Sequence, residues 1–258
     1  MDTVKNQTEK VERYFSSALC KANIDEINEN IFSEWQEVAN AGLTKNPPKG
    51  LPNPNEFLLN NYTRLSHEYM NDVPKNTKET IKIWSKIFVD VMIKTAKNNA
   101  TNLPRPYGQE SLAVNAATKY FNISGLEGVV IGSLNPWAEA YALANGAKHI
   151  TTIDYQKYII THPQMDYIFA LDLPAVSKKY YNKFDFAISF SSIEHSGLGR
   201  YGDPIDPIGD LREMNKIHCL LKPKGLLFLG LPVGIDSILY NAHRVYGRIR
   251  LAMMFEGH

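Results

Sequence analysis

The chain has 258 residues, of which 44% are hydrophobic and 21% are charged, and its formal net charge at pH 7 is +1. The length fits one large domain, or a medium domain with an extension, of ordinary globular composition. A net charge this close to zero gives no electrostatic reason to expect nucleic acid or an anionic membrane as a partner.

The cysteine content and the lack of long apolar runs indicate in which compartment the protein would lie. The two cysteines, Cys20 and Cys219, lie far apart and outside any metal-ligand spacing, which predicts neither a disulfide framework nor a metal site. The N-terminus carries no signal-peptide pattern, and no segment approaches the apolar length of a membrane span. We therefore expect a cytoplasmic protein with Cys219 packed as a small hydrophobe.

Residues 1–120 show the period of amphipathic helices. Apolar side chains recur at three- and four-residue steps from Ile24 to Val38, and again from Ile81 through Phe88 and Val91 to Thr95, as on one face of a helix. A further helical stretch runs from Gln109 to Phe121, and prolines in KNPPKGLPNP and NLPRP break the pattern between helices. The sequence predicts a helical N-terminal region over residues 1–120.

Residues 121–258 alternate short apolar strands with helices. Five segments rich in β-branched or aromatic residues predict strands, namely GVVIGS, HITTIDY, MDYIFALD, FDFAISF and GLLFLGLP. Helices are predicted between them, for example over residues 136–145 and over residues 207–221, the latter capped by Asp206. Near-continuous apolar strands are buried on both faces. The predicted fold class is α/β, a doubly wound and mainly parallel sheet.

The residues that follow the predicted strands are the first candidates for a binding site, because ligands of open α/β sheets bind beyond the carboxyl ends of the strands. Gly132 permits a tight turn after the first strand, and Ser133 follows it. Asp154 ends the second strand at the spacing of an acid that binds ribose hydroxyls, or it only caps a turn. Asp172 ends the third strand, where it would bind an adenine amino group or cap the next helix.

A polar loop with Gly and Pro follows the fourth predicted strand, in the segment SSIEHSGLGRYGDPIDP. Glu194 and His195 would be carried to the reactive end of a bound cofactor. His195 would act there as a base, or the pair would only order the loop and pack against its neighbours. Arg200, Tyr201 and Asp203 would contact a substrate, or the loop would only shape the turn into the next helix.

Two further segments bear on the kind of ligand that the protein would bind. His243 and Arg244 in YNAHRVYG would bind a carboxylate or phosphate of a substrate, or lie on a solvated helix face. The first loop, GSLNPW, does not fit G-x-G-x-x-G, which disfavours a nicotinamide-dependent oxidoreductase. A ligand that has a ribose but no pyrophosphate depends less on a glycine-rich pattern in this loop, and S-adenosylmethionine is such a ligand.

Long segments of the chain resemble a known family. FDFAISFSSIEHSG and DLREMNKIHCLLKPKGLLFLGLP resemble the fourth and fifth strand region of class I S-adenosylmethionine-dependent methyltransferases. More closely, GVVIGSLNPWAEAYALANGAKHITTIDY and SSIEHSGLGRYGDPIDPIGDLREM are similar to the family called domain of unknown function 268, as is GLPVGIDSILYNAHRVYGRIRL. The resemblance covers residues 128–251 and implies a class I methyltransferase-like, Rossmann-type fold.

The chain departs from the class I pattern in two places. Gly132 is the one glycine of its loop, where these enzymes have several. Few residues follow GLLFLGLP, so we expect the sixth and the antiparallel seventh strands of a full class I sheet to be missing, in a domain over residues 121–258 that is incomplete at its C-terminus. Such a loss would expose a sheet edge.

The predicted function is transfer of a methyl group from S-adenosylmethionine to a small-molecule or glycan-type acceptor. The resemblance implies that Gly132, Ser133, Asp154 and Asp172 hold the cofactor, and that the loop from Glu194 to Asp203 faces the acceptor. The helical N-terminal region would cover the cofactor cleft and exclude water. The alternative is a degenerate methyltransferase-like fold that serves as a binding or scaffolding module.

Overall fold

The computed structural model describes residues 24–73 and 81–256 of the chain. Its central element is a five-stranded sheet with the strand order β6-β4-β3-β7-β8, and every neighbouring pair in it is parallel. The bounds of these strands are β3 Glu127–Ile131, β4 His149–Asp154, β6 Met165–Phe169, β7 Phe184–Phe190 and β8 Leu221–Gly230. The strand order reverses beside β3, which opens a crevice at the carboxyl ends of β3 and β7.

The predicted α/β fold class is confirmed. Each of the five predicted strands is present, and the apolar residues of β3 and β7 form nearly unbroken buried runs. β8 begins at Leu221, earlier than predicted, because Leu221 already pairs with Phe184, and the register shifts before the next pair, Phe186 with Leu226. The segment LKPKG is therefore part of the strand.

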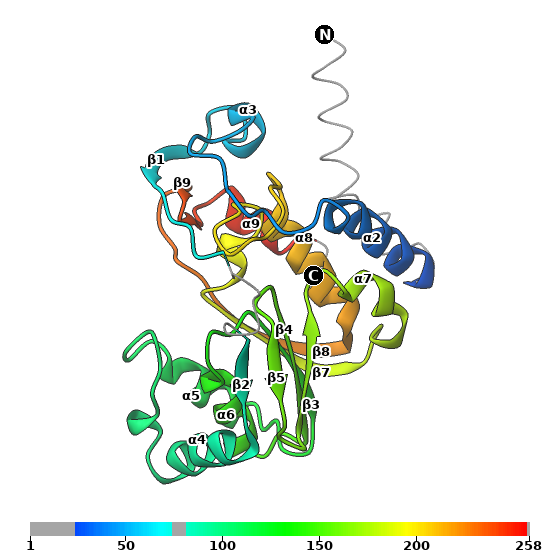
Figure 1. Cartoon of the computed structure of the whole chain (residues 1–258), viewed down its shortest axis with the longest axis vertical. Helices are drawn as coiled ribbons and strands as arrows, with labels where there is room; N and C mark the ends of the chain where they lie inside the picture. The colour runs from blue at the N-terminus through cyan, green and yellow to red at the C-terminus, as the bar shows by residue number, and fades with distance from the viewer. Residues whose placement is uncertain (1–23, 74–80, 257–258) are drawn as a thin grey trace.

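Helices cover both faces of this sheet (Figure 1). One core cluster joins Val129 of β3 to helices α2 Ile24–Ala39 and α8 Gly209–Leu220. The other joins Val130 to α4 Lys86–Asn98, α5 Leu112–Tyr120 and α6 Trp137–Ala144. Neighbouring residues of a strand point to opposite faces of the sheet, so adjacent valines contribute to two separate cores. The shorter helices are α3 Pro54–Phe57, α7 Leu173–Val176, α9 Arg250–Met254, η1 Ala100–Asn102, η2 Ser177–Lys179 and η3 Ile193–His195.

The helix predicted to begin at Ile81 begins later. Strand β2 Lys82–Trp84 occupies the start of that segment and pairs with β5 Tyr158–Ile160, which the sequence analysis did not predict. The side chain of Ser85 accepts a hydrogen bond from the backbone N–H of Phe88 and begins α4. A serine cap directly after a β-branched and aromatic pair explains why the chain changes from strand to helix here.

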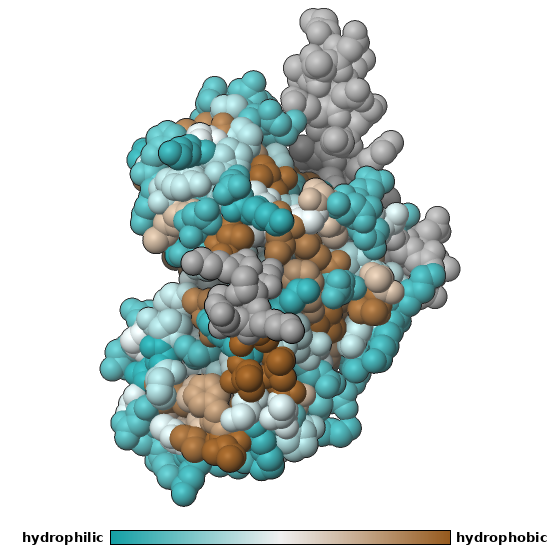
Figure 2. Space-filling view, in the orientation of Figure 1, coloured by the Kyte–Doolittle hydropathy of each residue, from teal (hydrophilic) through white to brown (hydrophobic). Residues whose placement is uncertain are grey.

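The buried face of α4 also differs from the predicted one. Phe88 and Val91 are 41% and 57% exposed, whereas Val89 and Met92 are buried against the sheet side of the helix. Figure 2 shows apolar side chains gathered over the region of β2, β5 and α4. The predicted apolar face was wrong because both sides of this helix carry apolar residues.

The N-terminal residues add strands as well as helices. Strand β1 Arg64–Glu68 pairs in parallel with β9 Ser237–Asn241, and β10 His243–Val245 completes a separate three-stranded sheet. Among the described residues, the segment after β8 adds no strand to the central sheet.

The remaining predicted helices begin and end close to the residues that the sequence predicts. Helix α8 begins at Gly209, and the carboxylate of Asp206 accepts from the backbone N–H of Ile208 in the turn just before it. Cys219 is 1% exposed and packs in the core as predicted, while Cys20 lies outside the described residues.

Candidate functional site

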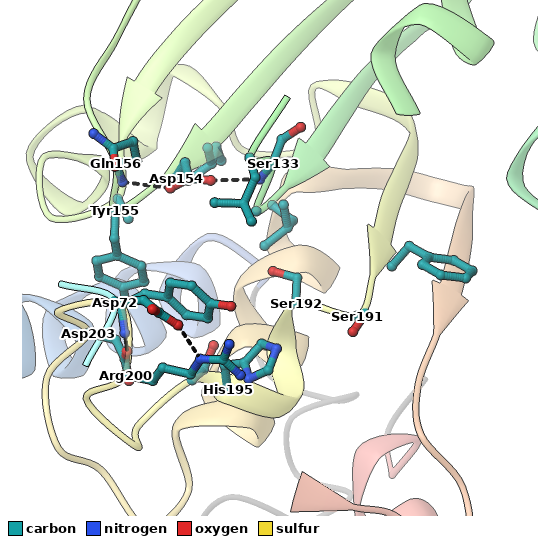
Figure 3. A pocket seen from close by; sticks show the side chains of 18 of the residues that line it. Asp72, Ser133, Asp154, Tyr155, Gln156, Ser191, Ser192, His195, Arg200 and Asp203 are labelled. Atoms are coloured by element: carbon teal, nitrogen blue, oxygen red, sulfur yellow. Dashed lines mark hydrogen bonds and ion pairs between the residues drawn. The ribbon is translucent and has the colours of Figure 1, made fainter. Parts of the chain in front are cut away.

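A cavity of about 480 Å³ opens at the carboxyl ends of β3, β4 and β7. This is the edge of the sheet where the strand order reverses, and the volume lies within the range of about 300–1,000 Å³ found for small-molecule sites. Most of the predicted site residues line it, namely Gly132, Ser133, Asp154, His195, Arg200, Tyr201 and Asp203. Figure 3 shows five of these residues around the cavity, at the strand ends and in the loop after β7: Ser133, Asp154, His195, Arg200 and Asp203.

Asp154 holds the turn after β3 to the end of β4. Its Oδ2 accepts from the backbone N–H of Ser133 at 2.6 Å, and its Oδ1 accepts from that of Gln156 at 2.6 Å (Figure 3). Burial raises the pKa of the Asp154 carboxyl to about 6, and these backbone donors oppose the rise. Each carboxylate oxygen has more than one lone pair, so the group keeps the capacity to accept from hydroxyls of a ligand in the cavity.

Gly132 occupies a conformation and a space that other residues do not fit. Its φ is 73°, in the left-handed region that favours glycine. A Cβ added at this position would lie 2.0 Å from Oγ of Ser192, which follows β7. The loops after β3 and β7 are therefore packed directly against each other, and the glycine permits this contact.

Glu194 is a buried acid just behind the cavity wall. Its side chain is 1% exposed, and Oε1 accepts from Oγ of Ser191 at 2.6 Å. Oε2 is buried without a hydrogen-bond partner among the described residues. Burial raises the pKa of Glu194 to about 7. Glu194 does not itself line the cavity, which is reached by its neighbours Ser191, Ser192 and His195.

His195 presents an unprotonated ring nitrogen. Its Nδ1 lies 2.6 Å from the carbonyl oxygen of Ala242, and since a carbonyl only accepts, Nδ1 carries the proton. Nε2 is then an acceptor, 3.8 Å from Oε1 of Glu194. Burial lowers the pKa of His195 to about 3, and the nearby Arg200 acts in the same direction. The ring is thus neutral at physiological pH, with a defined tautomer.

The loop after η3 combines cavity contacts with internal bracing. Arg200 donates from Nε to Asp72 at 2.8 Å (Figure 3), and its guanidinium lies 4.8 Å from the centre of the Tyr201 ring. The carboxylate of Asp203 accepts from the backbone N–H groups of Gly199 and Tyr201, and burial raises its pKa to about 6. Asp203 therefore shapes the loop as well as lining the cavity.

Three predicted residues lie away from the cavity. Asp172 is exposed at the start of α7 and makes no capping hydrogen bond there. His243 is on β10, with its ring 6.2 Å from that of His195. Arg244 is fully buried and donates to backbone carbonyls, including that of Ser196. The alternative of a solvated helix face for His243 and Arg244 is wrong, because they belong to a strand that packs beneath the loop.

Several cavity residues were missed by the sequence analysis. Asp72 and Tyr107 reach the cavity from the N-terminal region, and Glu213 and Lys216 reach it from α8. The ring of Tyr107 lies 5.4 Å from that of Phe190 at the end of β7. No local pattern marks Asp72 or Tyr107, since long-range packing brings them to the sheet. Glu213 and Lys216 form an ion pair at 2.7 Å, and their i, i+3 spacing in the sequence could have predicted that they lie on one face of the helix.

Within residues 24–73 and 81–256, no group of three or more His, Cys, Asp or Glu side chains is placed to hold a metal ion. No helix in the described part of the chain has the length and apolar character needed to cross a bilayer.

The strand order and the cavity at its reversal point define a doubly wound α/β fold of the Rossmann type. Residues 125–258 match the family described as "Caenorhabditis protein of unknown function, DUF268". This match spans more than half of the chain, so the protein belongs to that family. No curated protein matches it.

Solved structures with some likeness to the chain are distant. One is 1,6-didemethyltoxoflavin-N1-methyltransferase of Burkholderia thailandensis, solved with 1,6-didemethyltoxoflavin and S-adenosylhomocysteine, at 15% identity and a TM-score of 0.41, covering 65% of this chain and 76% of that one. Another is the [4+2]-cyclase SpnF, at 15% identity and a TM-score of 0.38, covering 71% of this chain and 73% of that one. The assignment of the fold rests on the strand order.

Proposed function

We propose that this protein binds S-adenosylmethionine in the cavity and transfers its methyl group to a small-molecule or glycan-type acceptor. The observation that carries the proposal is the pairing of Asp154 with the Gly132–Ser133 turn at the carboxyl edge of a parallel sheet. An acid at the end of the second strand is placed to accept from the two hydroxyls of a ribose. The glycine turn beside it holds Ser133 next to this acid at the edge of the cavity.

The residues present fit such a cofactor, which supplies an electrophilic methyl group when it is bound. Asp154 would accept from the ribose, and Gly132 and Ser133 would lie against the amino-acid part. Asp172 is exposed outside the cavity, so the adenine would instead meet Tyr155 and Ala170, which line the cavity after β4 and β6.

His195 and Glu194 would orient the acceptor. Nε2 of His195, the ring nitrogen without a proton, would accept a hydrogen bond from a hydroxyl or amine. Its lowered pKa makes it a weak base, so we assign it mainly to orientation, which accounts for much of the acceleration in reactions between two bound groups. Glu194 holds Ser191 at the cavity edge. Arg200 and Tyr201 would contact the acceptor.

The N-terminal region over residues 1–120 would cover the cleft of the methyltransferase-like domain over residues 121–258. The contributions of Asp72 and Tyr107 to the cavity support this role. Covering the cleft would exclude water from the methyl transfer.

Isothermal titration calorimetry with S-adenosylmethionine, S-adenosylhomocysteine and NAD tests the proposal. We expect micromolar binding of the first two ligands and none of NAD, since the first loop lacks the dinucleotide pattern. A folded protein that binds neither sulfur ligand would contradict the proposal. That result would favour the binding or scaffolding module, which the single glycine of the first loop already suggests.

A further inference from the structure

Behind the turn after β3 lies a second buried acid, Glu139, that takes no part in the proposed chemistry. It belongs to the first turn of α6 and is 0% exposed. Its carboxyl group contacts two hydroxyls, Oγ1 of Thr152 at 2.8 Å and Oγ of Ser133 at 3.1 Å. Ser133 is the residue whose backbone N–H donates to Asp154. Glu139 is therefore separated from the cavity by a single residue, Ser133.

A count of hydrogens shows which form of Glu139 this arrangement needs. Oγ of Ser133 also lies 2.8 Å from the carbonyl oxygen of Asn135, so three oxygen–oxygen contacts link the four groups. Each contact requires one hydrogen between its oxygens. Ser133 and Thr152 supply one each, and the carbonyl supplies none. With an ionised Glu139 one contact has no hydrogen, whereas a protonated Glu139 completes all three.

The electrostatic surroundings favour the same form. Burial is the largest influence on Glu139 and raises its pKa to about 7, with a smaller rise from the Asp154 carboxylate on β4. The hydroxyls and the backbone N–H of Glu139 itself lower it. Tyr158 on β5 is a further titratable group that interacts with Glu139, and its hydroxyl donates to the backbone carbonyl of Ser133 at 2.5 Å. Burial therefore shifts the balance toward the neutral acid, which predominates below about pH 7.

We infer that Glu139 is a positioning residue that works as a neutral carboxylic acid, donating to Ser133 and so fixing the turn that receives the cofactor. This inference rests on the proposed function. With Glu139 protonated, Ser133 is held on both sides, through its hydroxyl and through its N–H bond to Asp154. Ionisation of Glu139 leaves one of the two contacts of the Ser133 hydroxyl, to Glu139 or to the carbonyl of Asn135, without a hydrogen, and so loosens the turn. Cofactor affinity should therefore decline on the alkaline side of neutrality.

The variants Glu139→Gln and Glu139→Ala separate this role from simple packing. A glutamine keeps one acceptor for Thr152 and one donor for Ser133 but does not titrate, whereas alanine removes both. We expect the affinity of the wild-type protein for S-adenosylhomocysteine to fall about fivefold between about pH 6.5 and about pH 8.5, which is the effect of losing one hydrogen bond. This pH range lies on the alkaline side of the titration of Asp154. Glu139→Gln should bind equally well across this range, and Glu139→Ala should bind weakly throughout.

Carbon-13 NMR of the glutamate carboxyl groups gives a second readout that needs no ligand. The resonance missing from Glu139→Gln identifies Glu139, and we expect it to titrate near neutrality rather than near 4.5. A midpoint at the ordinary glutamate value would overturn the inference, as would a pH profile of binding that is the same in Glu139→Gln and the wild type. If the folded protein binds no S-adenosylhomocysteine at any pH, the proposed function fails, and the NMR midpoint still decides the state of Glu139.

Discussion

Replacement of Gly132 by alanine tests the contact between the loops that follow β3 and β7. The positive φ of Gly132 disfavours an L-residue by about 1–2 kcal/mol. The new Cβ would also lie 2.0 Å from Oγ and 2.8 Å from Cβ of Ser192, and overpacking of this kind costs about 1–3 kcal/mol. We therefore expect Gly132→Ala to lower the free energy of unfolding by about 2–5 kcal/mol.

A double-mutant cycle with Ser192→Gly separates the two causes. Removing the Ser192 side chain eliminates the overlap but leaves the positive φ unchanged, so Gly132→Ala should cost only about 1–2 kcal/mol in that background. Urea unfolding followed by circular dichroism measures all four proteins. The expected coupling is about 1–3 kcal/mol. Additive effects, within about 0.5 kcal/mol, would refute the packing of the two loops.

Three further predictions concern buried charge. Arg244→Met removes the donor to the loop carbonyls around Ser196 and should lower the free energy of unfolding by about 3 kcal/mol. Calorimetry should show this as a fall in Tm of about 6–12 °C, and an unchanged Tm would contradict the prediction. His195 should stay neutral with its proton on Nδ1 at about pH 5 in ¹⁵N NMR, because burial lowers its pKa to about 3; a cationic ring there would count against the assigned tautomer. Glu139, with its pKa raised from 4.5 to about 7, keeps a proton in the folded state that the unfolded chain has lost. Unfolding free energy should thus decline as pH rises through that window, and Glu139→Gln should remove on the order of 3 kcal/mol of the decline. Equal slopes in denaturant titrations of the two proteins would rule this out.

The central sheet could be predicted from the sequence because its strands carry their own signal. β3 and β7 are short runs of β-branched and aromatic residues, which fit a sheet buried on both faces. Residues that follow such strands must lie at one edge, so the convergence of Gly132, Asp154 and His195 followed from topology. Their roles remain predictions.

The errors arose where local pattern is ambiguous. The segment from Ile81 is apolar on more than one face, so its period did not distinguish β2 from the start of α4 or identify the buried side of the helix. Strand β10 is short and polar, and pairing with β9 rather than its own sequence buries Arg244. Contacts between distant segments decided these cases, and propensity is a weak guide to such contacts.

The cavity wall formed by the N-terminal region could not be predicted for the same reason. Asp72 follows β1, which reaches the site only because β1 pairs with β9, far along the chain. Glu139 was also missed, since a single acid in the first turn of a helix is usually a solvated favourable charge at the helix N-terminus. Its carboxyl group is buried where α6 packs against the sheet, beside Thr152 of β4 and Ser133 after β3, and the sequence does not specify this packing locally.

Calorimetric titration of three proteins with S-adenosylhomocysteine tests the central claim most directly. Asp154→Ala removes the acid in the cavity, and Asp172→Ala is a matched control that removes an exposed acid at a neighbouring strand end, outside the cavity. Circular dichroism establishes that each variant is folded. We expect micromolar binding by the wild type and by Asp172→Ala, and a loss of about tenfold or more in Asp154→Ala, the effect of hydrogen bonds to a charged group. Binding unaffected by Asp154→Ala, or absent from the folded wild type, would contradict the account.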